Sequence, residues 1–239
     1  MKRFELIPFA SASELADTVA TEWLNHVTAA LSARPFYAVA LSGGRISRSL
    51  FAAIAEKALA RKVSLDGVHF FWADERCVPP DDPESNFRLA YDLMLRPLNV
   101  REAHIHRIRG EEGPVAAAAA AEAELRRVVD ASGRPILDLV FLGLGEDGHI
   151  ASLFPGRSQP EEEGACYVPV FDAPKPPPSR VSLTASALSR AREVWMLASG
   201  AGKEAALDRS LIGATTPFGA LVARRSLTRI FTDIPVRAG

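Results

Sequence analysis

The sequence predicts an α/β fold in which a mostly parallel, doubly wound sheet of Rossmann type is flanked by helices. Short, continuously apolar segments alternate along the chain with longer segments whose apolar residues recur at helical spacing. Strands separated by helices in this way run parallel and are joined by right-handed crossovers. No repeat and no change of composition marks a boundary, so we expect residues 1–239 to form a single domain.

Helices are predicted where apolar residues recur every three or four positions. In chain order, these segments are 12–33, 47–61, a helix that carries Phe87, Tyr91 and Leu95, then 116–129 and 202–211. The alanine run at 116–121 is assigned to a helix rather than to a linker, because alanine has the highest helix propensity.

Strands are predicted where a short apolar run is bounded by turn residues. These runs are 36–41, 68–73, 103–108, 137–142, 181–183, 194–198, 221–223 and 228–232. The proline-rich segment 174–178 is predicted to be a rigid loop, and the acidic run 161–163 a solvated turn.

The composition restricts the class of function. A formal net charge of −1 argues against nucleic acid as the principal partner. No apolar segment is long enough to span a bilayer, and the N-terminus lacks the apolar core of a signal peptide. Cys77 and Cys166 are too few and too far apart to predict a disulfide framework or a zinc cluster. We therefore expect a cytoplasmic protein.

The segment 137–149 is the most informative part of the chain. A buried strand is followed by a glycine-rich stretch that contains Asp147 and His149. Ligands bind at the carboxyl ends of strands in parallel sheets, and glycines let the backbone approach them closely. A histidine there is a candidate general base. Taken alone, the pattern also fits a histidine that fills space or caps a helix.

Two other predicted strands end in polar groups. Ser42, Gly43 and Gly44 lie between a strand and a helix, where backbone amides can face an anion. The segment 74–76, with the sequence Asp-Glu-Arg, follows the next strand and brings charged groups to the same edge of the sheet. Three strand ends therefore carry chemically active groups together.

These segments resemble the 6-phosphogluconolactonase family, which belongs to a superfamily shared with glucosamine-6-phosphate deaminases. The resemblance extends through most of the chain, and the long block around His149 is its most specific part. The matching segments are 40–44, 72–79, 85–88, 143–156, the loop 175–177 with Arg180, and 200–203.

The resemblance implies hydrolysis of a sugar-phosphate δ-lactone to the open acid in the oxidative pentose phosphate route. His149 would take a proton from water as it attacks the lactone carbonyl, then return it to the ring oxygen. Asp147 would orient the imidazole or favour its cation, with a turn or helix-capping role as the alternative. Arg76 would face the oxyanion, with a salt bridge to a neighbouring acid as the alternative. Because the lactone is already electrophilic, no metal or other cofactor is expected.

The implied phosphate site combines amides with cations. Ser42, Gly43 and Gly44 form the strand-to-helix turn, while Arg180 and Lys203 match the basic positions that the superfamily uses for phosphate. Arg88 is a weaker candidate, because an arginine on a helix is more often solvated or ion-paired.

One departure from the family pattern follows the glycine pair. The family usually continues with Ser-Thr-Pro, whereas this chain has Arg45, Ile46 and Ser47. Ile46 offers no hydroxyl to a phosphate. Arg45 either replaces that hydroxyl with a charge or points into solvent.

Two rival functions are a sugar-phosphate isomerase with deaminase activity and a non-catalytic sugar-phosphate sensor. The deaminase relatives place a glutamate where this chain has Phe154, and phenylalanine cannot shuttle a proton between adjacent carbons. A sensor would be expected to lose His149 or to gain a further module.

His104 and His106 share a face of a predicted strand, but a structural role is favoured over metal binding. We expect a monomer or weak homo-oligomer whose partner is a small sugar phosphate.

Overall fold

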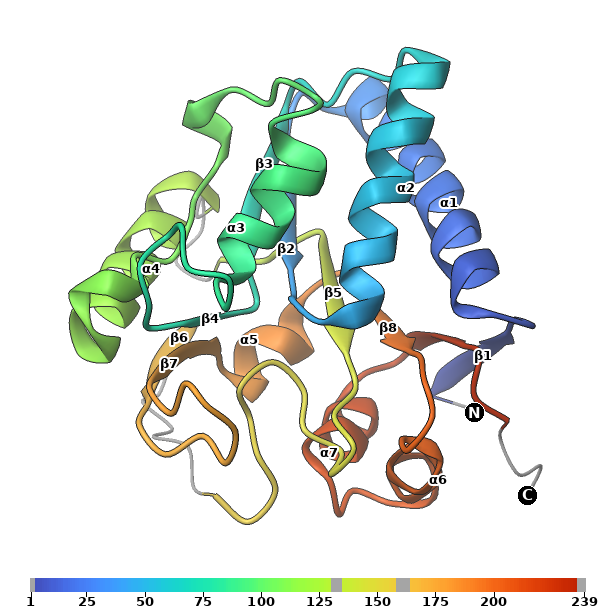
Figure 1. The fold of residues 1–239 in the computed structure, drawn as a ribbon, viewed down its shortest axis with the longest axis vertical. Coiled ribbons are helices and arrows are strands. Elements are labelled where there is room, and N and C mark those ends of the chain that lie inside the picture. Colours follow the sequence, from blue (N-terminus) through green and yellow to red (C-terminus); the bar gives the residue numbers. More distant parts are fainter. Residues whose placement is uncertain (1–2, 130–134, 158–163, 236–239) are drawn as a thin grey trace.

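The computed structural model describes residues 3–129, 135–157 and 164–235 (Figure 1). Its main sheet has six strands in the order β1-β9-β8-β5-β2-β3, and all neighbouring strands are parallel. The strands are β1 (Phe4–Pro8), β2 (Tyr37–Leu41), β3 (Val68–Trp72), β5 (Leu139–Gly143), β8 (Glu193–Ala198) and β9 (Thr228–Thr232). The chain proceeds from β2 to β3 in one direction and from β5 to β8 and β9 in the other. This order confirms the predicted doubly wound α/β fold and places its switch point between β2 and β5.

Helices connect and cover these strands. They are α1 (Ala12–Ala33), α2 (Arg45–Arg61), α3 (Asn86–Ala90), α4 (Pro114–Val129), α5 (Ala185–Arg190), α6 (Glu204–Ile212) and α7 (Pro217–Arg224). Helix α3 continues as a π-helical turn, Tyr91–Leu95, and short 3-10 turns occupy Glu102–His104 and Gly110–Glu112. Helices α1 and α2 lie side by side in Figure 1 and contact each other. Within the described ranges, no helix combines the length and apolar character that crossing a membrane requires.

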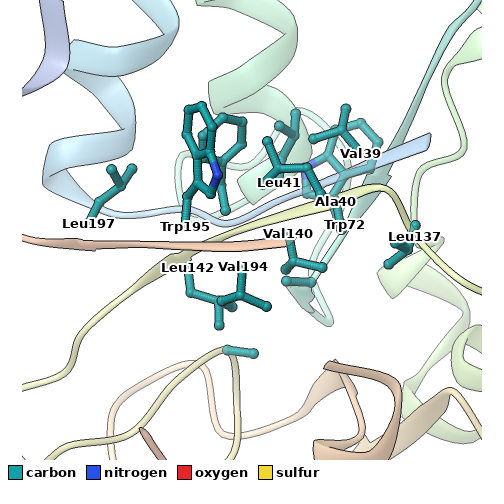
Figure 2. Close-up of a cluster of buried hydrophobic side chains, with 14 of the residues drawn as sticks. Val39, Ala40, Leu41, Trp72, Leu137, Val140, Leu142, Val194, Trp195 and Leu197 are labelled. Carbon is teal, nitrogen blue, oxygen red and sulfur yellow. The ribbon is translucent and has the colours of Figure 1, made fainter. Parts of the chain in front are cut away.

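The core surrounds the central strands. Figure 2 shows that Trp195 and Leu197 point to one side of β8 while Val194 points to the other, as alternation along a strand requires. All three side chains are buried, so both faces of the sheet are covered. Trp23 of α1 packs edge-to-face on Phe141 of β5, which identifies α1 as part of the cover on one face.

A second, three-stranded antiparallel sheet lies beside the carboxyl ends of the main sheet. It has the order β4-β7-β6, formed by β4 (Asp74–Arg76), β7 (Arg180–Leu183) and β6 (Tyr167–Val170). Its register sets Arg76 directly opposite Arg180. This small sheet thus brings together two arginines that are distant in the sequence.

The structure corrects two predicted strands. Residues 221–223 belong to helix α7, because Leu221 and Val222 lie three and four residues after the buried Phe218 and share its helical face. Thr216 caps that helix by accepting a hydrogen bond from the amide of Gly219. Residues 103–108 contain part of a 3-10 turn and a single β-bridge from Ile105 to β3, not a strand.

Some elements were not predicted, and one predicted feature lies outside the description. Strands β1, β4 and β6 and helix α5 had no prediction, because their segments are short, polar or interrupted. The acidic run 161–163 falls outside the described residues.

Candidate active site

A cavity of about 360 Å³ lies at the carboxyl ends of β2 and β5, at the switch point of the sheet. Its walls come from the turn after β2, the loop after β5, the small sheet and the turn before α6. The residues that line it include Ser42, Gly43, Gly44, Arg45, Asp74, Arg76, Glu84, Asn86, Glu146, His149, Phe154, Lys175, Arg180 and Lys203. The structure therefore brings together most of the residues that the sequence indicated.

The loop after β5 is shaped by two glycines. A Cβ atom on Gly145 would lie 2.0 Å from Nδ1 of His149, so only glycine leaves room for the imidazole there. Gly148 has a φ of +89°, and a Cβ atom on it would also collide with Thr216. These glycines let the loop fold back under the His149 ring, as the backbone hydrogen bond from Gly145 to the His149 carbonyl also shows.

Asp147 orients His149. Its Oδ1 accepts a hydrogen bond from the His149 ring Nδ1 at 2.5 Å and another from the His149 backbone amide at 3.1 Å. Burial acts to raise the pKa of Asp147, but the hydrogen bonds from His149 outweigh burial and hold it below its ordinary value. An ionised carboxylate only accepts, so Nδ1 carries the proton and Nε2 is left as the basic nitrogen.

The His149 ring lies at the cavity wall against Phe154, with ring centroids 4.7 Å apart. The side chain is 19% exposed, and within the described part of the chain Nε2 has no hydrogen-bond partner. A basic nitrogen beside a cavity, with its tautomer fixed by a carboxylate, suits proton transfer to and from a bound molecule.

Arg76 projects from β4 into the same cavity. Its Nη1 donates to the Glu84 carbonyl at 2.6 Å and lies 3.4 Å from the Glu84 carboxylate. The Nε of Arg76 is buried and has no partner among the described residues. Arg76 therefore forms the salt bridge that the sequence left open as an alternative, and it also retains an unused donor.

The turn after β2 leaves backbone amides open at the start of α2. Gly44 precedes α2 with a φ of +109°, and no side chain caps the first amides of that helix. Gly43 has no room for a side chain, because a Cβ atom would lie 1.9 Å from Oδ1 of Asn86. The Ser42 hydroxyl donates to the Phe141 carbonyl and thereby ties β2 to β5. Its proton is thus already used within the protein.

Two cations lie beside the first turn of α2. Arg45 extends toward the turn after β8, since a Cβ atom on Gly200 would be 3.9 Å from its Nη2. Burial lowers the pKa of Lys203, and the nearby Arg45 charge lowers it further. Within the described ranges, neither side chain forms a hydrogen bond or ion pair. Arg45, Lys203 and the open amides of α2 together form a positively charged end of the cavity.

Arg180 is buried in the opposite wall. Its Nε donates to the Pro177 carbonyl at 2.9 Å and its Nη2 to the Lys175 carbonyl at 2.7 Å. Burial lowers its pKa, although the nearby Asp74 acts in the opposite direction. The guanidinium lies 5.7 Å from the centre of the Phe154 ring. Arg180 therefore holds the loop 175–177 in place while it lines the cavity.

Arg88 does not reach the cavity. Its Nη1 donates to the Asp81 carbonyl at 2.5 Å, and its Nε lies 3.6 Å from the Asp92 carboxylate. The side chain is 43% exposed. Arg88 thus has the solvated, ion-paired position of an ordinary helix arginine, and the structure does not bring it together with the other predicted phosphate ligands.

Asn86 lines the cavity, and the sequence alone does not indicate a role for it. Its Nδ2 donates to the Asp74 carbonyl at 2.9 Å, and its Oδ1 lies against Gly43. The signal that could have found it is the capping pattern at 85–88, in which the Ser85 hydroxyl accepts from the Arg88 amide and starts α3. Such a cap fixes the direction of the first helical residue, here Asn86.

The histidines His104 and His106 lie elsewhere, next to His69. His106 is buried, and its ring bonds to His69 at 2.9 Å and to Glu124 at 2.7 Å. In the described part of the chain, no group of three histidine, cysteine or acidic side chains is arranged to hold a metal ion. His106 thus links His69 of β3 to Glu124 of α4 through hydrogen bonds.

Comparisons with known proteins agree on one family. The model for glucosamine-6-phosphate isomerases/6-phosphogluconolactonase matches residues 10–229. A 6-phosphogluconolactonase of Streptomyces coelicolor is 33% identical over 218 residues, covering 88% of this chain and 84% of that protein. One of Mycobacterium tuberculosis is 35% identical over 209 residues, or 84% of each chain. The structure of a 6-phosphogluconolactonase from Trypanosoma cruzi is similar with a TM-score of 0.83 and 26% identity, covering 95% of this chain and 94% of that one.

Proposed function

The chain belongs to the glucosamine-6-phosphate isomerase/6-phosphogluconolactonase family, and from this premise we propose that it hydrolyses 6-phospho-D-glucono-1,5-lactone to 6-phospho-D-gluconate. One observation carries the proposal: the free Nε2 of His149 and the cationic end formed by Arg45 and Lys203 line the same cavity. A site for a sugar phosphate needs one end that carries out the reaction and another that binds the phosphate group. The pentose phosphate route and a cytoplasmic location belong to the same proposal.

In this proposal, the Nε2 of His149 removes a proton from the attacking water. The oxygen of that water bonds to the lactone carbonyl carbon, and the charge that develops on the carbonyl oxygen is met by Arg76. The carbon–oxygen bond of the ring then breaks, and His149 returns the proton to the departing ring oxygen. Asp147 maintains the tautomer that these transfers require and stabilises the imidazolium.

The phosphate is proposed to bind at the first turn of α2. Its oxygens would accept hydrogen bonds from the open amides near Gly44 and contact Arg45 and Lys203. Arg180 shapes the opposite wall, and its remaining guanidinium nitrogen faces no partner that the structure describes. We include Arg180 among the proposed ligands and leave Arg88 out.

Phe154 favours lactone hydrolysis over amino-sugar isomerisation. It is buried and packs between the His149 ring and the Arg180 guanidinium. An isomerase needs a group that carries a proton between adjacent carbons, and a phenyl ring at this place carries none.

The proposed function is tested by offering the purified protein two substrates. We expect release of acid from 6-phospho-D-glucono-1,5-lactone well above the spontaneous rate, and no ammonia from glucosamine 6-phosphate. Freshly generated lactone should be used, with the spontaneous hydrolysis subtracted. Ammonia release without lactone hydrolysis would reverse the assignment.

Arg45→Ala is expected to weaken binding of the product 6-phosphogluconate severalfold. An exposed ionic contact contributes about 1 kcal/mol or less, but a contact to phosphate inside a cavity contributes more. The affinity of the unaltered protein should also depend more steeply on salt than that of the variant, because salt screens the Arg45 charge. Calorimetric titration at two ionic strengths measures both effects.

A matched control for Arg45 lies on the same helix. Arg48→Ala removes the same charge from an exposed position that does not line the cavity. The affinity of this variant for 6-phosphogluconate should stay unchanged. The double variant Arg45→Ser with Ile46→Thr restores the usual family residues and should recover much of the loss. Equal affinities for Arg45→Ala and Arg48→Ala would show that Arg45 does not contact the phosphate.

A further inference from the structure

Glu75 is a buried carboxylate that the proposed mechanism does not use. It lies in β4 between Asp74 and Arg76 and is 2% exposed. Among the described residues it forms no ion pair, and its two oxygens instead accept four hydrogen bonds. Oε1 accepts from the amides of Arg76 at 2.7 Å and Asn86 at 2.8 Å. Oε2 accepts from the Phe87 amide at 2.7 Å and the Ser85 hydroxyl at 3.2 Å.

These four donors belong to the two segments that hold the Arg76 side chain. One is the peptide of Arg76 itself, in β4. The others begin α3, directly after Glu84, whose carbonyl receives the Arg76 guanidinium at 2.6 Å. Glu75 thus holds the backbone from which the Arg76 side chain extends, and it also holds the segment whose Glu84 carbonyl the Arg76 guanidinium contacts.

We propose that Glu75, as a carboxylate, is the positioning residue that holds Arg76 in the geometry required for lactone hydrolysis. This inference rests on the proposed function, since it gives Glu75 a part in that reaction. Glu75 touches no reacting atom and does not line the cavity. It acts through Arg76, whose side chain lines the cavity and is proposed to meet the oxyanion.

The hydrogen-bond pattern favours the ionised form of Glu75. A protonated carboxyl group, or the amide of glutamine, carries hydrogen on one of the two positions that now only accept. Three of the four partners are backbone amides, which cannot accept that hydrogen. The fourth, the Ser85 hydroxyl, accepts from the Arg88 amide as the cap of α3, and it could take this hydrogen on its second lone pair only by turning its own proton away from Oε2. Protonation, or replacement by glutamine, therefore disrupts at least one of the four hydrogen bonds that anchor the start of α3.

Burial places this protonation in the range where the enzyme would work. Burial raises the pKa of Glu75 to about 7, the three backbone hydrogen bonds oppose the rise, and the neighbouring Asp74 adds to it. The Glu75 charge in turn raises the pKa of Cys77 on the following loop and of Arg107, the other titratable groups that face it. As pH falls below neutral, the carboxylate takes up a proton, Arg76 loses its fixed position, and kcat declines.

The test compares Glu75→Gln with a matched carboxylate elsewhere. Oε2 of Glu122 accepts from the amides of Cys166 and Tyr167 at 2.7 and 2.9 Å, away from the cavity. Glu75→Gln is expected to lower kcat for the lactone about 10- to 100-fold at pH near 8, with a much smaller change of KM, because a misplaced catalytic group chiefly affects the transition state. Glu122→Gln should lose stability without this fall in kcat. A Glu75→Gln variant with the kcat of Glu122→Gln would overturn the proposal.

The pH profile provides a readout that a purely structural role would not move. Glu75 must be ionised for Arg76 to be held in place, so log kcat of the wild type and of Glu122→Gln should fall as the pH drops below about 7. Glu75→Gln has no carboxyl group to protonate at this position, so its log kcat should fall less steeply over the same pH range. Equal slopes in Glu75→Gln and the wild type would contradict the inference.

A second variant decides the matter even where Glu75→Gln fails to fold. Because Glu75 acts through Arg76, the Arg76→Ala variant should already show a less steep fall of log kcat below neutral pH than the wild type. Adding Glu75→Gln to Arg76→Ala should cause no further loss of kcat. If the two residues acted independently, their separate losses of kcat would multiply. A fall of log kcat in Arg76→Ala as steep as that of the wild type, or losses of kcat that multiply in the double variant, would overturn the proposal. Absence of lactone hydrolysis in the wild type would instead refute the proposed function.

Discussion

His149→Ala is expected to reduce lactone hydrolysis by about 100- to 10,000-fold while the fold is retained, because a positioned proton-transfer group contributes about that factor. The ring lies at the cavity wall, and its described contacts are Asp147 and Phe154. Its removal therefore leaves the core of the sheet intact. The loss should appear in kcat, since the phosphate end of the cavity is unchanged.

Initial rates after subtraction of spontaneous hydrolysis measure this effect, and thermal unfolding verifies the fold. His104→Ala is the matched control, because His104 lies near His69, outside the residues that line the cavity. It should retain the wild-type rate. Near-normal turnover of His149→Ala would show that His149 is structural and would remove the base from the mechanism.

Arg76→Ala is expected to lower kcat by about 100- to 1,000-fold, the usual loss when one donor to an oxyanion is removed. KM should change far less, because the charge that Arg76 meets develops only after the water attacks. Steady-state kinetics on the lactone separates the two constants.

If Arg76 only formed a salt bridge with Glu84, the result of Arg76→Ala would be different. That pair is partly exposed at the Glu84 carboxylate, which is 56% exposed, so it contributes little to stability. If Arg76 served only this pair, Arg76→Ala and Glu84→Gln would have similar, small effects on stability and leave kcat near normal. A large fall of kcat in Arg76→Ala alone supports the oxyanion role.

Much of the fold could be predicted because its signals are local. The apolar runs of β2, β5 and β8 are continuous since both faces of each strand are covered, and the long amphipathic pattern of α1 repeats over its whole length. The prediction failed for residues 221–223, where three apolar residues suit a strand as well as the inner face of a short helix. The cap at Thr216 and the buried Phe218 decide for the helix, and both lie outside the run.

By itself, the sequence determined the α/β class, the glycine-rich loop that carries His149, and the grouping of polar residues at three strand ends. These features follow from chain-local properties: side-chain periodicity, the conformational freedom of glycine and the fixed direction of parallel strands. The family resemblance then indicated which reaction such an edge performs.

Only the tertiary structure decided what each charged residue does. Arg76 and Arg88 look alike in the sequence, yet one faces the cavity beside Arg180 and the other pairs with Asp92 at the surface. Glu75 reads as one more charge in a polar stretch, but its burial and its four donors make it an internal anchor. The physical reason is that desolvation and hydrogen-bond partners come from segments far apart in the chain, and those segments meet only when the sheet and its loops have formed.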